Sequence, residues 1–168
     1  MRNRYRRCAP ARDRSRGFTL VEVLVALTLL ALLASVALPF TDLVQRRGKE
    51  AELRQALITI RTAIDTYKQA SDDGRVEKTV DASGYPPDLN ALVDGVVDRK
   101  NPNGDMIYFL RRLPADPLCE CSGKAAADTW ETRSYSSSPD AFASGKDVFD
   151  IRSKSERKGI NGIPYSQW

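Results

Sequence analysis

The sequence predicts an α+β protein in which a long N-terminal helix packs, through its second half, on a small C-terminal domain with a short antiparallel sheet. Three observations lead to this fold class. An uninterrupted apolar run extends from residue 18 to residue 40. A stripe of apolar side chains with helical spacing follows it, and two short strand-like segments lie near the C-terminus. The first half of the helix is therefore expected to cross a membrane and the second half to be amphipathic.

The apolar run contains a single charged residue. It holds 23 residues, Phe18 to Phe40, and as a helix it would span about 34 Å, enough to cross a bilayer core of roughly 30 Å. Glu22 is the only ionisable side chain in it. A carboxylate placed inside a membrane costs about 2.5–3.5 kcal/mol near the centre, so its presence calls for a functional reason. Pro39 removes a backbone donor and predicts a kink near the end of the run.

The chain divides by composition into four parts. Residues 1–17 form a basic leader, 18–40 the membrane helix, 41–70 an amphipathic continuation of that helix, and 71–168 a globular α/β region. In the continuation, apolar side chains recur every three or four residues and predict one buried stripe. They are Leu53, Leu57, Ile60, Ile64 and Tyr67. Smaller elements are expected in the last part: a helix from Asp88, a turn at 101–104, and strands at 130–135 and 147–153.

The net charge of +4 misrepresents most of the chain. The leader holds seven arginines and one aspartate, so the residues after it carry 19 basic and 21 acidic side chains. The positive charge is confined to the leader, which argues against nucleic-acid binding. An arginine-rich segment before an apolar helix favours a cytoplasmic N-terminus, which puts the C-terminal domain in the periplasm if the host is Gram-negative.

Two ordinary readings of the N-terminus compete with a functional one. A basic segment before an apolar stretch also describes a secretory signal, with Ser35-Val36-Ala37 as a cleavage site. The run is longer than the usual 7–15 residues of such a signal, and Glu22 near its start would weaken it. A plain signal anchor, whose glutamate reaches the interface, is the other reading.

The junction Gly17-Phe18-Thr19-Leu20-Val21-Glu22 resembles the processing site of the type IV pilin-like family, the prepilins and the pseudopilins of type II secretion. The resemblance implies cleavage after Gly17 by prepilin peptidase and N-methylation of Phe18. It also implies assembly of subunits through their membrane helices, with a bend near Pro39. The new α-amino group on Phe18 would lie four residues before Glu22, so the two charges could pair within one chain or between adjacent chains. An ion pair of this kind would fix the register of a helical assembly.

Late motifs are similar to those of the G-type, or major, pseudopilins. They are 113–117 (LPADP), 149–153 (FDIRS) and the closing Trp168. The implied function is a structural subunit of a type II secretion pseudopilus that drives protein export. Its implied partners are copies of itself, other pseudopilins, the peptidase and an inner-membrane assembly platform. Two alternatives stay open: a type IV pilin or minor pilin of a surface filament, and a membrane-anchored periplasmic binding domain that never polymerises.

Members of this subfamily often bind calcium in the final loop, through a serine, backbone carbonyls and a late acidic pair. Ser153 matches the serine, but Ile163-Pro164-Tyr165 replaces the acidic pair. Calcium prefers six to eight oxygen ligands with carboxylates among them. We therefore expect no metal or other cofactor, with Ser153 as the remnant of a calcium loop.

Cysteine and histidine usage argues against enzyme chemistry. Cys8 lies in the leader, and Cys119 and Cys121 are two residues apart. The latter pair could form a local disulfide, bond between chains or stay as free thiols. The chain contains no histidine, which removes Ser-His-Asp and Cys-His catalytic systems and histidine metal sites. No glycine-rich phosphate loop is present, and we expect no enzyme activity.

Overall fold

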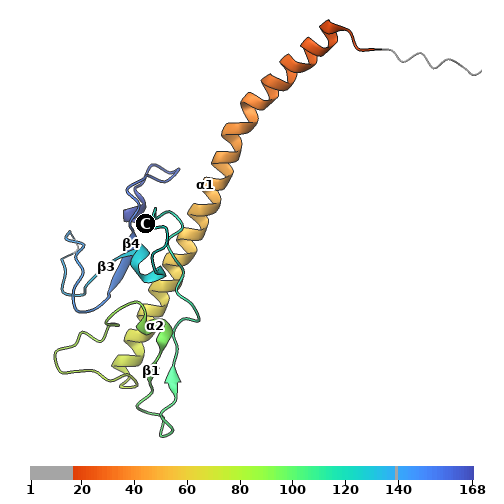
Figure 1. Cartoon of the computed structure of the whole chain (residues 1–168). Helices are drawn as coiled ribbons and strands as arrows, with labels where there is room; N and C mark the ends of the chain where they lie inside the picture. Colours follow the sequence, from red (N-terminus) through yellow and green to blue (C-terminus); the bar gives the residue numbers. More distant parts are fainter. Residues whose placement is uncertain (1–16, 139) are drawn as a thin grey trace, which may run out of the picture. The chain divides into compact units, whose positions relative to one another are not determined.

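The computed structural model describes residues 17–138 and 140–168, except the side chains of residues 36–39. The leader at 1–16, including Cys8, lies outside the described residues. Two compact units make up the chain: the first ends at Leu43 and the second runs from Val44 to Trp168. Figure 1 gives the order of their elements.

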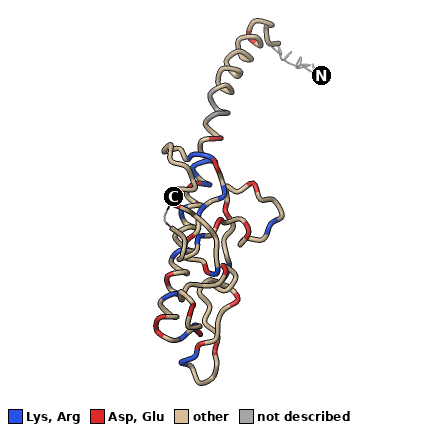
Figure 2. The backbone as a smooth tube through the Cα atoms, turned by 90° about the vertical axis from the view of Figure 1, so that its left-hand side faces the viewer, with Lys and Arg blue, Asp and Glu red and all other residues tan. Residues whose placement is uncertain are grey.

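Helix α1, Leu20–Asp72, is the dominant element and confirms the predicted long helix. Between Glu22 and Asp42 it contains no charged residue, and the described part of this stretch is tan in Figure 2. It ends two residues later than the sequence indicates. Gly74 adopts φ +71°, and the amide of Arg75 donates to the carbonyl of Ala70 at 2.9 Å. A glycine in the left-handed region is a usual way to close the last turn of a helix.

The second half of α1 buries the predicted stripe. Leu53, Ile60 and Ile64 are each 0% exposed, and Leu57 and Tyr67 are nearly so. Small elements of the second unit cover this face with side chains from all along residues 76–165. Those side chains are Val76, Leu89, Leu92, Leu113, Leu118, Trp130, Val148, Ile151 and Tyr165. The stripe thus forms one side of the hydrophobic core, and its burial contributes to the hydrophobic driving force for folding of this unit.

The first group of small elements follows Tyr85-Pro86-Pro87. Helix α2 is a single turn, Ala91–Asp94, shorter than the expected helix from Asp88. Strands β1, Val96–Val97, and β2, Met106–Ile107, pair antiparallel. Their connection is the predicted turn at 101–104, closed by the amide of Gly104 on the carbonyl of Asn101 at 3.0 Å.

The second group carries the C-terminal motifs. The 3-10 helix η1, Ala126–Thr129, leads into β3, Trp130–Arg133, which pairs antiparallel with β4, Asp150–Ser153. The expected strands are present but shorter, and the two pairs form separate sheets. The chain closes with the 3-10 helix η2, Tyr165–Gln167. Together these elements confirm the α+β, pilin-like fold class.

Candidate functional site

The predicted cleavage junction lies outside the helix. Residues 17–19 are non-helical, and α1 begins at Leu20. Thr19 is the residue that starts the helix: its Oγ1 accepts a hydrogen bond from the amide of Glu22 at 3.2 Å, and its carbonyl accepts one from the amide of Val23 at 3.2 Å. Phe18 is 80% exposed. The junction between Gly17 and Phe18 is therefore non-helical and exposed.

Thr19 is a functional residue that the sequence reasoning missed. Thr-x-x-Glu before an apolar run is the pattern of a capping box, in which a threonine hydroxyl binds the third amide of the helix. Thr19 and Glu22 have this spacing. This spacing is the local sequence signal from which the cap can be predicted.

Glu22 lies in the first turn of α1. It is exposed, and it forms no salt bridge with any residue that the structure describes. The amide ends of the first turn carry a partial positive charge that favours a carboxylate there. The attraction between this partial charge and the carboxylate is much weaker than the attraction of a full counter-ion in a low-dielectric environment. The carboxylate is thus held by the helix at a defined place without a described cationic partner.

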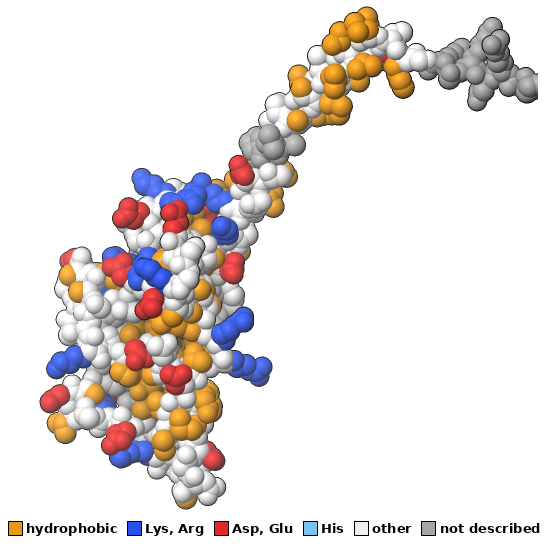
Figure 3. Space-filling view, viewed as in Figure 1, with side chains coloured by type: hydrophobic (Ala, Val, Ile, Leu, Met, Phe, Trp, Pro, Cys, Tyr) orange, Lys and Arg blue, Asp and Glu red, His pale blue; other side chains and the backbone are white. Residues whose placement is uncertain are grey.

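The first half of α1 presents apolar side chains on all its faces. Among the described residues it is the one helix long and apolar enough to cross a membrane, and Figure 3 shows its apolar side chains clustered along the visible face. The large exposed ones in this segment are Leu20, Val21, Val23, Leu24, Val25, Leu27, Leu29, Leu30, Leu32 and Leu33. A helix apolar all round is stable only inside lipid or among other helices.

Pro39 lies within helix α1, and its side chain is outside the described part of the structure. The kink at this position stays a prediction.

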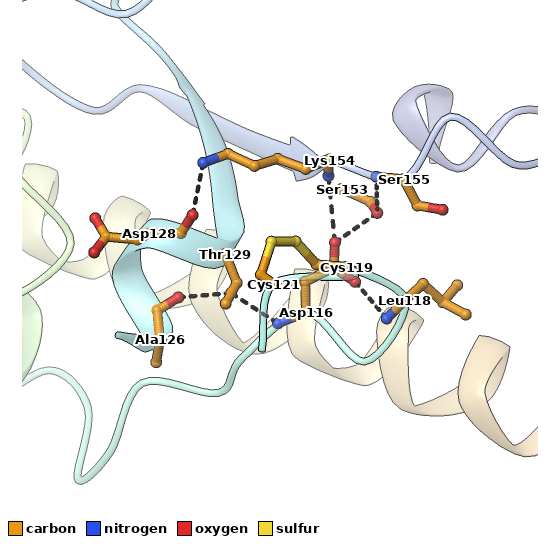
Figure 4. The surroundings of a disulfide bond; sticks show 10 residues. All are labelled: Asp116, Leu118, Cys119, Cys121, Ala126, Asp128, Thr129, Ser153, Lys154 and Ser155. Atoms are coloured by element: carbon orange, nitrogen blue, oxygen red, sulfur yellow. Dashed lines mark hydrogen bonds between the residues drawn. A yellow bond between two sulfur atoms is a disulfide. The ribbon is translucent and has the colours of Figure 1, made fainter. Parts of the chain in front are cut away.

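Ser153, the predicted remnant of a calcium loop, forms a hydrogen bond with another side chain of the same chain. Its hydroxyl donates to Oδ2 of Asp116 at 2.6 Å. The same carboxylate accepts the amide of Lys154 at 3.3 Å and, on Oδ1, the amide of Leu118 at 2.8 Å. Figure 4 shows these groups converging. Ser153 is 1% exposed and Asp116 is 5% exposed, so this is a buried acid satisfied by neutral donors.

Acidic groups of the kind that hold a metal are not assembled around this serine. In the described part of the chain no group of three or more carboxylate, cysteine or histidine side chains is placed to share an ion. Cys119 and Cys121, which follow Asp116, are joined as a disulfide, seen beside it in Figure 4.

A buried glutamate on α1 forms hydrogen bonds with the last loop, the segment that follows β4. Glu50 is 6% exposed, and its Oε1 accepts the hydroxyl of Tyr165 at 2.8 Å and the amide of Ile160 at 2.8 Å. Arg46 donates from Nε to the Tyr165 oxygen at 3.5 Å. This hydrogen bond raises the pKa of the Arg46 guanidinium, although burial opposes it. The sequence contains a signal for Glu50, since it lies three residues before Leu53 on the buried stripe.

Two arginines of α1 contact Trp168. The guanidinium of Arg61 donates to Oδ1 of Asp150 at 2.8 Å, to the carbonyl of Ile151 at 3.1 Å and to the carbonyl of Trp168 at 2.9 Å. The guanidinium carbon of Arg54 lies 4.5 Å from the centre of the Trp168 ring. Side chains of α1 therefore hold both ends of the final loop directly.

Comparison with known proteins agrees with this architecture. Residues 12–38 match the family described as the prokaryotic N-terminal methylation motif. The type II secretion system core protein G of Klebsiella pneumoniae is 32% identical over 112 residues, which cover 62% of this chain and 70% of that protein. The core protein G of Escherichia coli (strain K12) is 27% identical over 112 residues, covering 64% and 69%. That of Pectobacterium carotovorum subsp. carotovorum is 30% identical over 105 residues, covering 62% of each. No solved structure matches the chain.

The methylation motif, the apolar first half of α1 and the small α+β unit define a pilin-like subunit. The chain belongs to the type II secretion system core protein G family, the G-type pseudopilins. Members of this family are structural subunits, so the expectation that the chain is not an enzyme is confirmed.

Proposed function

We propose that this pseudopilin polymerises through the first half of α1 into a periplasmic fibre that drives protein export across the outer membrane. The observation that carries the proposal is Glu22, an exposed carboxylate with no described cationic partner at the head of an exposed apolar helix. Within the described residues of a single chain neither feature is satisfied, and both become satisfied when helices of several copies pack together.

Processing supplies the missing counter-ion in this mechanism. Prepilin peptidase cleaves after Gly17 and methylates the new amine of Phe18. The helix can then extend to the new terminus, which is four residues from Glu22 and so on the same face. The carboxylate of one subunit pairs with the amine of an adjacent subunit, and each entering copy is placed in register. The assembly platform of the inner membrane and other pseudopilins are the partners in this step.

Membrane topology follows the charge of the leader. Seven arginines precede the apolar run, which favours a cytoplasmic leader and a periplasmic second unit. The one helix of the described residues that is long and apolar enough to span a membrane fits anchoring in the inner membrane before assembly. Extraction of the helix into a fibre then replaces lipid contacts with helix–helix contacts.

The mature chain is expected to begin at Phe18 and to carry one added methyl group. The junction between Gly17 and Phe18 is exposed and precedes the helix, and Thr19 marks where the helix begins. Intact-mass measurement of the purified membrane form checks both modifications. A chain that begins at Leu38 would indicate a cleaved secretory signal, and an unprocessed chain would indicate a plain anchor.

Deleting the gene tests the proposed role in the cell. Culture-supernatant proteins should fall while surface filaments persist, and expression of the parent chain should restore export. Loss of surface filaments with unchanged export would favour a type IV pilin. Restored export by a chain that cannot form fibres would favour a non-polymerising periplasmic domain.

The final loop is proposed to need no calcium. The protein's own groups hold it: Glu50 binds Tyr165 and Ile160, and Arg61 binds the Trp168 carbonyl. Ser153, the matched calcium ligand, donates its hydroxyl to Asp116.

We therefore expect the thermal unfolding midpoint of the full chain to be the same with calcium and with a chelator. Differential scanning calorimetry in detergent checks this, with a magnesium-only sample as the control for ionic strength. A midpoint that rises only with calcium would show that a metal completes the loop.

A further inference from the structure

Positive charge in the second unit is concentrated in two stretches that lie against each other. Residues 44–54 and 154–163 together hold seven basic and three acidic side chains, whereas the remaining residues after position 17 hold twelve basic and eighteen acidic. The two stretches are in contact, because Nη2 of Arg46 donates to the carbonyl of Lys158 and the amide of Ile160 donates to Glu50 at 2.8 Å. The blue segments of helix α1 and of the last loop lie close together in Figure 2.

The cations of this surface are largely free to meet a partner. Arg47, Lys49, Arg157 and Lys158 are exposed. Their side chains form no salt bridge with any residue in the described ranges, 17–138 and 140–168. Glu50 is buried and occupied by Tyr165 and Ile160, so it does not neutralise them from outside. Glu52 and Glu156 are the exposed carboxylates of the two stretches.

The basic surface also has a groove and an apolar tip. A groove of about 370 Å³ lies between α1 and the last loop, lined by Arg47, Glu50, Ala51, Arg54, Ile160 and Asn161. The loop turns sharply beside it, since the amide of Gly159 donates to the carbonyl of Ile163 at 2.8 Å. Ile160 and Ile163 on this turn are 41% and 46% exposed. Exposed apolar side chains bordered by cations are typical of surfaces that lie at the lipid interface.

Chain length allows this surface to reach a bilayer that contains the apolar run. Arg47 follows Phe40, the last residue of the apolar run, by seven residues. Seven residues rise about 10 Å as a helix and reach no more than about 25 Å when fully extended. The headgroup layer that borders the hydrocarbon core is itself several ångströms thick. The connecting chain is therefore short enough to let the groove reach the phosphate groups.

We propose that this surface binds the phosphate headgroups of anionic phospholipids in the outer leaflet of the inner membrane. The residues that define it are Arg47, Lys49, Arg157 and Lys158, with Arg54 in the groove and Ile160 and Ile163 at the tip. Arginine guanidinium groups suit phosphate because they donate several hydrogen bonds in one plane. Binding of this kind would hold the second unit on the membrane until the subunit is extracted. The inference rests on the proposed membrane anchoring by residues 18–40.

The test uses the full chain reconstituted at one copy per lipid nanodisc, which excludes contacts between copies. Discs of phosphatidylcholine alone are compared with discs that also contain phosphatidylglycerol, and amide hydrogen exchange is measured. We expect exchange of the loop at 157–163 to slow in the phosphatidylglycerol discs and the effect to fade at high salt. Each basic side chain that contacts such a surface strengthens binding by about fivefold.

The variant Arg47→Gln/Arg157→Gln removes two cations whose side chains form no hydrogen bond or salt bridge with the described residues, so it should fold and lose most of the lipid-dependent protection. Arg112→Gln, an exposed arginine outside both stretches, is the matched control and should behave as the parent. Unchanged exchange in β3 and β4 verifies folding of each variant.

Failure of the chain to enter the discs would overturn the anchoring itself. Three results with an inserted chain would overturn only the lipid site: equal exchange in both kinds of disc, protection that survives in the double variant, or protection that appears only with two copies per disc. The last of these would assign the basic surface to a neighbouring subunit.

Discussion

Glu22→Gln and Glu22→Leu are expected to abolish fibre formation and the export that depends on it. Either change removes the negative charge that we propose as the partner of the Phe18 amine. An ion pair 4 Å apart is worth about 4 kcal/mol at an effective dielectric constant of 20. Loss of that attraction should lower the amount of assembled fibre by more than about tenfold, since 1.4 kcal/mol already corresponds to a factor of ten. Fibres recovered from the cell and proteins in the culture supernatant are the two quantities to measure.

Two companions make this experiment specific to the charge. Glu22→Asp keeps a carboxylate on a side chain one methylene shorter and should retain part of the assembly. Glu120→Gln removes the same charge from an exposed position of the second unit and should leave both quantities unchanged. Membrane levels of each variant must match the parent. Full fibre formation by Glu22→Leu would show that packing of apolar helices is sufficient and that the carboxylate has another role.

Asp116→Ala is expected to lower the free energy of unfolding of the second unit by about 3–5 kcal/mol. The substitution removes the acceptor of three hydrogen bonds, from the hydroxyl of Ser153 and the amides of Leu118 and Lys154. Ser153 is 1% exposed, so water does not readily replace the lost acceptor. Each buried donor without a partner costs about 1–3 kcal/mol. Urea denaturation of the full chain in detergent, followed by tryptophan fluorescence, measures the effect.

The control for this prediction is Asp81→Ala, which removes a carboxylate from an exposed position and should change stability by no more than about 0.5 kcal/mol. Adding Ser153→Ala to Asp116→Ala should cost less than Ser153→Ala does alone, because the two side chains share one interaction. Equal stability of Asp116→Ala and Asp81→Ala would mean that the buried acid contributes nothing to the fold.

The long helix and its buried face were predictable from the sequence because both follow from local periodicity. Leu53, Leu57, Ile60, Ile64 and Tyr67 recur at the spacing of one helix face, and all are buried. The late strands were predicted with boundaries that were too wide. A two-stranded ladder is limited by where its partner ends, as β3 is by β4, and pairing between distant segments leaves little trace in local sequence.

The site was predictable only where its pattern is local. The cleavage junction and Glu22 lie within six consecutive residues. The capping role of Thr19 has an equally local signal in the Thr-x-x-Glu spacing. The contacts of Glu50 with Tyr165 and of Arg61 with Trp168 join residues more than 100 positions apart. Local periodicity does not predict such contacts. The position of Glu50 on the buried stripe indicates only that a distant donor must satisfy its carboxylate.

A reconstruction of isolated fibres by electron cryomicroscopy tests the register mechanism most directly. It should place the α-amino nitrogen of Phe18 in one subunit within about 4 Å, the usual limit of a salt bridge, of the Glu22 carboxylate of its neighbour. A fibre in which every Glu22 carboxylate faces only its own chain, or no amine at all, would contradict the mechanism.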